Sequence, residues 1–194
     1  MTLYFLRHGE TDYNLEKRIQ GWSDVPLNDL GIFQAEEVGE KIRANGIEFD
    51  KVFSSPLRRA IRTAEVVTGL DRTDIKVDQR LIEMGFGKYE GRRLKHIPED
   101  VFDLILNTEK IEESGFSEGP NDVLERTKSF LEQMKSIDSK SNVLCVSHGV
   151  TIRAMLSNLN GDGKSIPWDA KVGNCALFVT ELQNGAYTPL RQIL

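Results

Sequence analysis

Short apolar runs alternate with amphipathic helical patterns along this 194-residue chain, and the alternation restricts the possible folds more than any other feature. Asn142–Ser147 has the clearest pattern of a buried strand, and shorter strand-like runs occupy Leu3–Leu6 and Lys51–Ser54. Strands and helices that follow one another in this way favour helices layered on a sheet. We therefore predict an α/β protein, a three-layer α/β/α sandwich with a mostly parallel central sheet.

Capping and turn residues predict where several elements begin and end. Asn28 is the expected N-cap of a helix over residues 30–44, and Asn45-Gly46 is the expected stop. Ser55-Pro56 predicts the start of the next helix, with serine as N-cap and proline at the first helical position. Four further elements are expected: a short strand at Ile75–Val77, helices over 123–137 and 152–159, and a hairpin at Asn184-Gly185 between 176–182 and 187–193.

No linker, repeat or low-complexity tract divides the chain, so we expect one domain over residues 1–194. Periodicity weakens and charge is dense between Gly87 and Gly119, and we interpret residues 87–119 as a small cap inserted over the site. His96 in this stretch is expected to be a surface residue, with substrate contact as the alternative. Four aromatic residues in or beside the cap either line it or hold it together: Phe86, Tyr89, Phe102 and Phe116.

The formal net charge is −5, which argues against a nucleic-acid partner, because such partners usually need a basic face. The apolar stretch before Arg7 is too short for a signal peptide or a membrane span, so we expect a cytoplasmic protein without membrane contact. Cys145 and Cys175 are expected to be buried free thiols. The oligomeric state stays open between a monomer and a homodimer.

Two of the three histidines stand where a predicted strand meets a glycine, in Arg7-His8-Gly9 and in Ser147-His148-Gly149. A third predicted strand ends at Ser54-Ser55, and Arg58 and Arg59 follow it. In open α/β sheets, ligands bind outside the carboxyl ends of the strands. Arginine forks match phosphate oxygens, and a histidine of near-neutral pKa supplies a nucleophilic nitrogen or a hydrogen-bond donor. The sequence therefore predicts a phosphate site that gathers cationic side chains of a chain with net negative charge.

Spacing separates the arginines that follow the second strand. Arg58 and Arg62 lie four residues apart, so they share a helix face that we expect to be solvated, whereas Arg59 points elsewhere. His8 and His148 lack the local spacing of metal ligands, so no metal site is expected.

Four motifs follow in order across nearly the whole chain. They are Arg7-His8-Gly9-Glu10-Thr11 with Asn14, Arg18-Ile19-Gln20-Gly21-Trp22, Asp24-Val25-Pro26-Leu27, Gly31 and Gln34-Ala35; Ser54-Ser55-Pro56-Leu57-Arg58-Arg59-Ala60-Ile61-Arg62-Thr63-Ala64; Leu81-Ile82-Glu83 through Tyr89-Glu90-Gly91; and Ser147-His148-Gly149 with Arg153. The set resembles the histidine phosphatase superfamily, also called the phosphoglycerate mutase-like family. The resemblance implies a phosphoglycerate mutase-like fold with a small cap and an enzyme that needs neither cofactor nor metal.

The resemblance also implies roles for individual residues. His8 would attack phosphorus and carry the phosphoryl group as phosphohistidine. Glu83 would protonate the leaving oxygen and later activate water, with Glu90 as a nearby rival for that role. The phosphate-binding and substrate-binding set would be Arg7, Asn14, Gln20, Gly21, Arg59, His148 and Gly149.

Three functions remain open after the resemblance is drawn. The leading hypothesis is a phosphatase that hydrolyses small phosphorylated metabolites. A cofactor-dependent phosphoglycerate mutase is less favoured, because the stretch after the third motif is short and acidic (Thr108–Ser114) and Val150 stands where mutases typically have asparagine. A non-catalytic module that binds a phosphorylated ligand is disfavoured, because every core histidine and arginine of the motifs is present.

Overall fold

A mixed sheet forms the middle layer of the computed structural model, which describes residues 1–97 and 115–194. The strands are β1 (Thr2–Arg7), β2 (Lys51–Ser54), β3 (Lys76–Val77), β4 (Asn142–Ser147), β5 (Leu177–Gln183), β6 (Ala186–Tyr187) and β7 (Arg191–Gln192). Their order is β3-β2-β4-β1-β5-β6, and β7 pairs with β5 on a separate path. The four strands from β3 to β1 are parallel, and β5 is antiparallel to β1.

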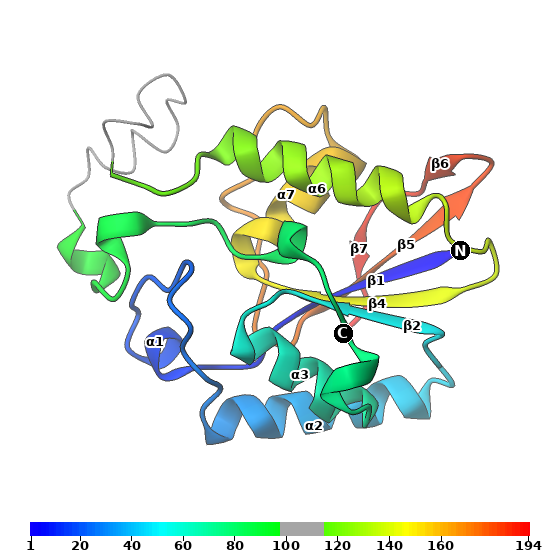
Figure 1. Cartoon of the computed structure of the whole chain (residues 1–194), viewed down its shortest axis with the longest axis horizontal. Coiled ribbons are helices and arrows are strands. Elements are labelled where there is room, and N and C mark those ends of the chain that lie inside the picture. Colours follow the sequence, from blue (N-terminus) through cyan, green and yellow to red (C-terminus); the bar gives the residue numbers. More distant parts are fainter. Residues whose placement is uncertain (98–114) are drawn as a thin grey trace.

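Helices cover both faces of this sheet. In Figure 1, α6 (Pro120–Met134) and α7 (Gly149–Asn160) lie above it, and α2 (Asp29–Ala44) and α3 (Arg58–Thr68) lie below it. The remaining helices are short: α1 (Asp12–Leu15), η1 (Arg72–Asp74), η2 (Gln79–Leu81), η3 (Gly87–Tyr89) and η4 (Leu94–His96), the last four being 3-10 turns. The predicted three-layer α/β/α sandwich with a mostly parallel sheet is therefore confirmed.

Strand β1 divides its side chains between two cores. Leu3 and Phe5 pack with residues of α6 and α7, whereas Tyr4 and Leu6 pack with residues of α2 and α3. This follows from the two-residue period of a strand, because successive side chains point to opposite faces. Each large apolar side chain buried in this way contributes about 1.5–3 kcal/mol. The apolar character of β1 thus reflects a helix layer on each side.

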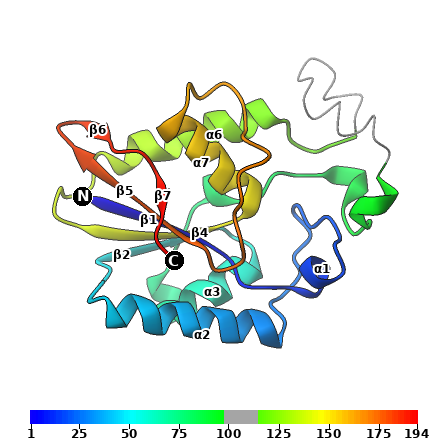
Figure 2. The same ribbon diagram turned by 180° about the vertical axis from the view of Figure 1, so that it is seen from behind.

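The parallel register brings three carboxyl ends of strands together. Arg7 at the end of β1 pairs with Ser147 at the end of β4, and Ser54 of β2 pairs with Val146. His8, His148 and Ser55 therefore leave the sheet side by side. Figure 2 shows β1 running from the N-terminus across the sheet to the end of the molecule where α1 lies.

The predicted boundaries hold for most elements. The side chain of Asn28 caps α2 by accepting from the Gly31 amide, and the helix ends at Ala44, directly before the predicted stop. The hairpin is confirmed, since Asn184 and Gly185 both have positive φ, of 51° and 82°, as a tight hairpin turn requires. The strand predicted over 187–193 is instead two short strands, β6 and β7, which both pair with β5.

The start of α3 differs from the prediction. The helix begins at Arg58 with Leu57 as its N-cap, so the observed cap lies two residues after the expected one, Ser55. The Ser55 hydroxyl is occupied by Nε2 of His148 at 2.6 Å, and Asp24 accepts the first helical amide, Arg58 N, at 2.8 Å. A side chain from a distant loop therefore caps the helix, and local sequence gives no sign of it.

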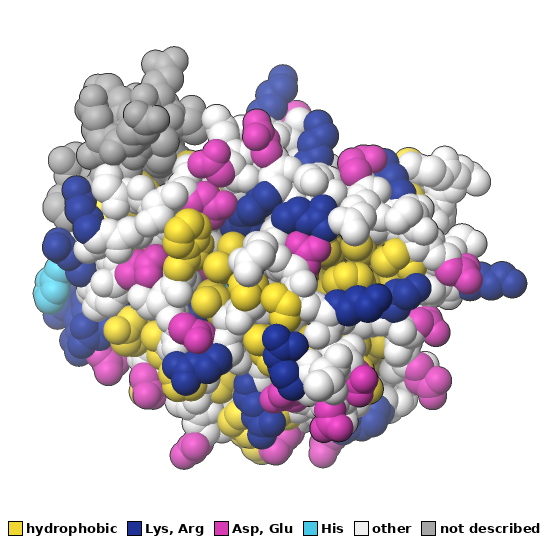
Figure 3. Space-filling view, viewed as in Figure 1, with side chains coloured by type: hydrophobic (Ala, Val, Ile, Leu, Met, Phe, Trp, Pro, Cys, Tyr) yellow, Lys and Arg dark blue, Asp and Glu magenta, His cyan; other side chains and the backbone are white. Residues whose placement is uncertain are grey.

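The surface carries both signs of charge. On the face shown in Figure 3, basic and acidic side chains are intermingled, with hydrophobic side chains between them. Cys145 and Cys175 are buried and unpaired, as predicted. Within the described residues, no helix has the length and apolar character needed to cross a membrane.

Candidate active site

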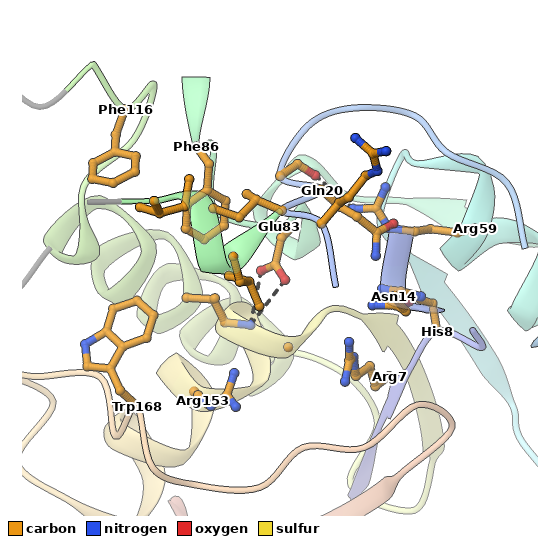
Figure 4. Close-up of a pocket in the computed structure, with 17 residues that line it drawn as sticks. Arg7, His8, Asn14, Gln20, Arg59, Glu83, Phe86, Phe116, Arg153 and Trp168 are labelled. Carbon is orange, nitrogen blue, oxygen red and sulfur yellow. Dashed lines mark hydrogen bonds between the residues drawn. The ribbon is translucent and has the colours of Figure 1, made fainter. Parts of the chain in front are cut away.

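A cavity of about 530 Å³ opens at the carboxyl ends of β1 and β4. Its lining consists of Arg7, His8, Asn14, Arg18, Ile19, Gln20, Gly21, Arg59, Glu83, Phe86, Leu94, Ile97, Phe116, Gly149, Val150, Arg153 and Trp168. Figure 4 shows two sides: Arg7, His8, Asn14 and Arg59 lie together, while Phe86, Phe116 and Trp168 lie opposite them, with Glu83 between. The cavity thus has a cationic side and an aromatic side.

His8 is held in one orientation on the cationic side. Its Nδ1 lies 2.7 Å from the carbonyl of Gly9, its backbone amide donates to Ser147 O, and its carbonyl accepts from Asn174. An Nδ1–H bonded to a carbonyl leaves Nε2 as an unprotonated nitrogen that faces the cavity. Burial, followed by the charges of Arg59 and Arg7, holds the pKa of His8 well below its usual range. His8 is therefore neutral and able to act as a nucleophile.

The turn after His8 is fixed by its neighbours. Gly9 N donates to Thr63 Oγ1 of α3 at 3.1 Å, and the hydroxyl of Thr63 donates to Arg59 O. A Cβ atom on Gly9 would lie well inside contact distance of Gly31 O at the start of α2. The turn that carries His8 is thus anchored to both helices of the lower layer.

Two arginines supply the positive charge beside His8. Arg59 is fully buried and gives three of its donors to the protein: Nη2 to Gly21 O and Nη1 to Ser23 O, both at 2.8 Å, and Nε to His148 Nδ1 at 3.3 Å. Burial lowers the pKa of Arg59 to about 10, which still leaves it charged at neutral pH. Nη1 of Arg7 donates to Val172 O at 2.6 Å, while its buried Nε has no hydrogen-bond partner among the described residues. An anion at this place would satisfy that donor.

His148 lies behind Arg59 and does not line the cavity. Its Nδ1 accepts from Arg59, and its Nε2 lies 2.6 Å from the Ser55 hydroxyl, so both ring nitrogens are engaged with the protein. The rings of His8 and His148 lie 5.1 Å apart between centroids. Burial and the charge of Arg59 lower the pKa of His148 well below its usual range. The predicted contact between His148 and phosphate stays a prediction.

The other predicted binding residues all line the cavity. Asn14 uses Oδ1 to accept from Thr11 and from Asn174, which leaves its amide hydrogens as donors. Oε1 of Gln20 is buried and has no hydrogen-bond partner among the described residues. Gly21 has a φ of 54° and Gly149 begins α7, so both bring backbone close to the cavity.

Glu83 is the carboxylate inside the cavity, and Glu90 is not among the lining residues. Oε1 of Glu83 accepts from the amides of Met84, Val150 and Thr151 at 3.0, 3.2 and 3.2 Å. Oε2 has one longer contact, 3.3 Å to Val150 N. One oxygen is therefore anchored at the start of α7, and the other is the better placed to exchange a proton. Of the two carboxylates considered for proton transfer, Glu83 is the one that a bound substrate could reach, and its role stays a prediction.

Arg153 and Trp168 also line the cavity, although the sequence alone assigns neither of them a role. Nε of Arg153 donates to Ala170 O at 2.8 Å, and its Nη groups make no hydrogen bond among the described residues. Nη1 of Arg153 lies 3.5 Å, and Nε of Arg7 3.7 Å, from the point where a Cβ of Gly149 would sit. The signals for Arg153 in the sequence were its place in the fourth motif and its spacing of one helical turn from Gly149. A lone tryptophan in a polar loop was the only signal for Trp168.

The cap residues divide between lining and support. Phe86 and Phe116 line the cavity and pack edge to face with centroids 5.8 Å apart, while buried Tyr89 packs against Phe116 at 5.2 Å. Both expected roles of the aromatic residues are therefore found among these three: Phe86 and Phe116 line the cavity, and contacts with Phe116 hold the group together. His96 is exposed and outside the lining. Phe102, Thr108–Ser114 and most of the predicted cap lie outside the described residues.

Metal ligands do not gather anywhere in residues 1–97 and 115–194: no three His, Cys, Asp or Glu side chains are grouped so that they would hold an ion. The groups that fit a bound anion are the cationic ones around His8.

The family model of the histidine phosphatase superfamily (branch 1) matches residues 3–192. The chain belongs to this superfamily. Among its relatives is a Hydrogenobacter thermophilus protein named "Putative phosphoserine phosphatase 2", 34% identical over 178 residues, which are 90% of this chain and 86% of that protein. A histidine phosphatase fold is thus shared over almost the entire sequence.

Solved structures also support membership of this superfamily. Phosphoserine phosphatase from Entamoeba histolytica, in complex with 3-phosphoglyceric acid, superimposes with a TM-score of 0.82 at 26% identity, covering 100% of this chain and 96% of that one. Phosphoglycerate mutase from Thermus thermophilus superimposes with a TM-score of 0.73 at 27% identity, covering 100% and 99%. The chain is therefore a histidine phosphatase superfamily enzyme of phosphatase or mutase type, with a phosphoglycerate mutase-like fold.

Proposed function

We propose that this enzyme hydrolyses small phosphate monoesters through a phosphohistidine on His8. The neutral ring of His8 carries the proposal, because Nδ1 is bound to Gly9 O and Nε2 faces a cavity with Arg7 and Arg59 beside it. Phosphoryl transfer depends mainly on positioning and on stabilising charge, and these residues supply both.

The reaction has two steps. Nε2 of His8 attacks phosphorus, the bond to the ester oxygen breaks, and Glu83 gives its proton to that oxygen. Water then attacks the phosphohistidine, Glu83 takes a proton from the water, and inorganic phosphate leaves with His8 restored. Splitting the reaction through a covalent intermediate replaces one difficult step by two easier ones, and one carboxyl group serves as acid and then as base.

The substrate we favour carries a carboxylate near its phosphate. Arg153 has free Nη donors on the cavity side, next to Gly149 and Arg7. A guanidinium binds a carboxylate with two parallel hydrogen bonds. The relatives named after phosphoserine and the neighbour bound to 3-phosphoglyceric acid support such a substrate class.

A phosphoglycerate mutase remains the second candidate, because a solved neighbour over the whole chain has that name. Val150 opposes it: the position after Gly149 has an apolar side chain that lines the cavity, and its amide is bound to Glu83. The acidic stretch Thr108–Ser114 also argues against a mutase. This argument rests on the sequence alone, because the stretch lies outside the described residues.

Two assays on wild type and His8→Ala test the proposal. We expect wild type to hydrolyse p-nitrophenyl phosphate and phosphoserine, and His8→Ala to hydrolyse neither. Conversion of 3-phosphoglycerate primed by 2,3-bisphosphoglycerate, with negligible hydrolysis, would identify a mutase instead. No turnover of any ester by wild type would favour the non-catalytic binding module.

A further inference from the structure

The carboxylate of Glu90 joins two segments that hold the reacting groups. One is the loop Gly21–Ser23, which contacts Arg59, and the other is the segment Glu83–Phe86, which begins at the proton carrier. We propose that Glu90 is a positioning residue that fixes Arg59 and Glu83 relative to each other. The inference rests on the proposed function, since it assigns Glu83 a role in proton transfer.

Arg59 is placed by the carbonyls of the loop. Its Nη2 and Nη1 donate to Gly21 O and Ser23 O, which flank Trp22, each at 2.8 Å. Glu90 holds the same loop from the other side. Its Oε1 accepts from Trp22 N at 2.9 Å, and its Oε2 accepts from the amide and the hydroxyl of Ser23 at 2.8 and 2.7 Å. Glu90 thereby determines where the acceptors of Arg59 lie.

Glu83 is tied to the same carboxylate by two routes. Oε1 of Glu90 accepts from Phe86 N at 3.1 Å, three residues beyond Glu83. Nε1 of Trp22 donates to Glu83 O at 2.8 Å, so the loop residue next to the acceptors of Arg59 also holds the backbone of the acid. A Cβ on Gly85 would lie 2.8 Å from the Trp22 ring, which shows how closely ring and segment meet.

The geometry leaves Glu90 no direct part in the chemistry. It does not line the cavity, and its two oxygens accept from four donors of the loop and the segment. A carboxylate suits this place because every neighbour is a donor. An amide would put its own N–H groups against the donors of one oxygen. At the place of Oε1 they would face Trp22 N and Phe86 N, and at the place of Oε2 they would face the amide and the hydroxyl of Ser23. Either placement loosens the loop. The fit is close, since a Cβ on Gly21 would collide with Oε1 of Glu90.

Three variants test the coupling: Glu90→Gln, Trp22→Phe and, as a matched control, Glu132→Gln, whose side chain is exposed and bound to Lys135. Two quantities are measured: inhibition by inorganic phosphate, which reports on Arg59, and the ratio of turnover on 2,4-dinitrophenyl phosphate to that on propyl phosphate. A good leaving group needs no proton, so the ratio reports on the proton carrier.

We expect Glu90→Gln to change both quantities, because it loosens the loop that holds Arg59 through two carbonyls and the backbone of Glu83 through Trp22 Nε1. Its inhibition constant for phosphate should rise about tenfold, and its turnover ratio should rise at least about tenfold. Trp22→Phe should raise the turnover ratio alone, because it removes only the bond to Glu83 O. Glu132→Gln should match wild type. Loss of a residue that merely stabilises the fold would lower turnover of both esters by the same factor, because less enzyme is active. The inhibition constant for phosphate and the turnover ratio would then stay unchanged.

A folded Glu90→Gln protein with an unchanged ratio, or with unchanged phosphate inhibition, would overturn the inference. If Glu90→Gln does not fold, Trp22→Phe decides: an unchanged ratio there overturns it as well. Wild type without any turnover would remove the proposed function, and the inference with it. If wild type turns over phosphate esters and His8→Ala does not, the proposed function is supported regardless of the result for Glu90→Gln.

Discussion

Nε of Arg59 lies 3.3 Å from Nδ1 of His148, and the hydrogen bond between them requires that ring nitrogen to be unprotonated. The other nitrogen, Nε2, then carries the proton toward the Ser55 hydroxyl at 2.6 Å. The guanidinium is itself fixed by two loop carbonyls. The tautomer of His148 and the place of Arg59 therefore depend on each other.

Arg59→Lys should damage the enzyme although it keeps the charge. Lysine lacks the planar fork, so Gly21 O, Ser23 O and His148 Nδ1 cannot all stay bonded. We expect the free energy of unfolding to fall by about 1–3 kcal/mol and kcat/KM to fall by about 10²-fold or more. Urea denaturation and steady-state kinetics measure both. Arg62→Lys is the control: Arg62 is exposed and paired with Glu65 alone, so unfolding should change by less than about 0.5 kcal/mol.

The two buried histidines should make the protein sensitive to mild acid. Burial and the Arg59 charge lower the pKa of His8 and of His148 in the folded state, whereas the unfolded value is about 6.5. A depressed folded pKa gives stability that is present above about pH 6.5 and is lost as pH falls. We expect each histidine to remove about 1.4 kcal/mol from the free energy of unfolding between pH 7.5 and 5.5.

Urea denaturation at several pH values checks this expectation. His8→Asn should retain about half of the histidine-dependent loss. His96→Asn should retain all of it, because His96 is exposed. Equal free energies of unfolding at pH 7.5 and 5.5 in wild type would show that the histidines are not held neutral.

Glu83→Gln should separate the two chemical steps. Glutamine can keep a carbonyl oxygen at the amides of Met84, Val150 and Thr151, so the fold should hold. Turnover of alkyl phosphates should fall by about 10²–10⁴-fold, because proton transfer is lost. With 2,4-dinitrophenyl phosphate, a burst of one phenolate per enzyme should precede slow turnover, since only hydrolysis of phosphohistidine then needs the base. Full-rate hydrolysis of alkyl esters would exclude Glu83 from the mechanism.

Arg153→Gln should affect substrates according to their carboxylate. We expect KM for phosphoserine to rise about 10–100-fold, the loss of a charged hydrogen-bond pair. Propyl phosphate lacks the carboxylate and provides the internal control, so its KM should stay within about twofold. Equal increases for the two esters would mean that Arg153 binds the phosphate itself.

The layers of the fold and the close approach of His8 and His148 were predictable because their signals are local. The middle of β4, residues 143–146, is apolar throughout because α6 and α7 cover one face of the strand and α3 contacts its other side. His8 and His148 stand beside glycines at strand ends, where the parallel register brings them together. The place where the two histidines meet could therefore be inferred without knowing any side-chain contact.

Features that depend on distant contacts left no pattern to detect. Asp24 caps α3 from a loop 34 residues away, so the helix starts at Arg58 although Ser55-Pro56 has the local signature. Trp168 reaches the cavity from a loop that shows no periodicity. In the sequence Glu90 is a rival to Glu83 as the acid, and only the four donors around its oxygens indicate a different role.

The contact between Gly9 and Gly31 limits how this site is able to diversify. Neither position has room for a methyl group, because a Cβ on either one meets backbone of the other segment. A combinatorial library aimed at new substrates should therefore leave residues 9 and 31 unchanged, along with the nucleophile they hold. Variation belongs on the opposite wall, at Phe86, Phe116 and Trp168, where side chains rather than backbone meet the ligand space. Substrate specificity can then change on the aromatic wall of the cavity, while the residues around His8 on the other wall stay the same.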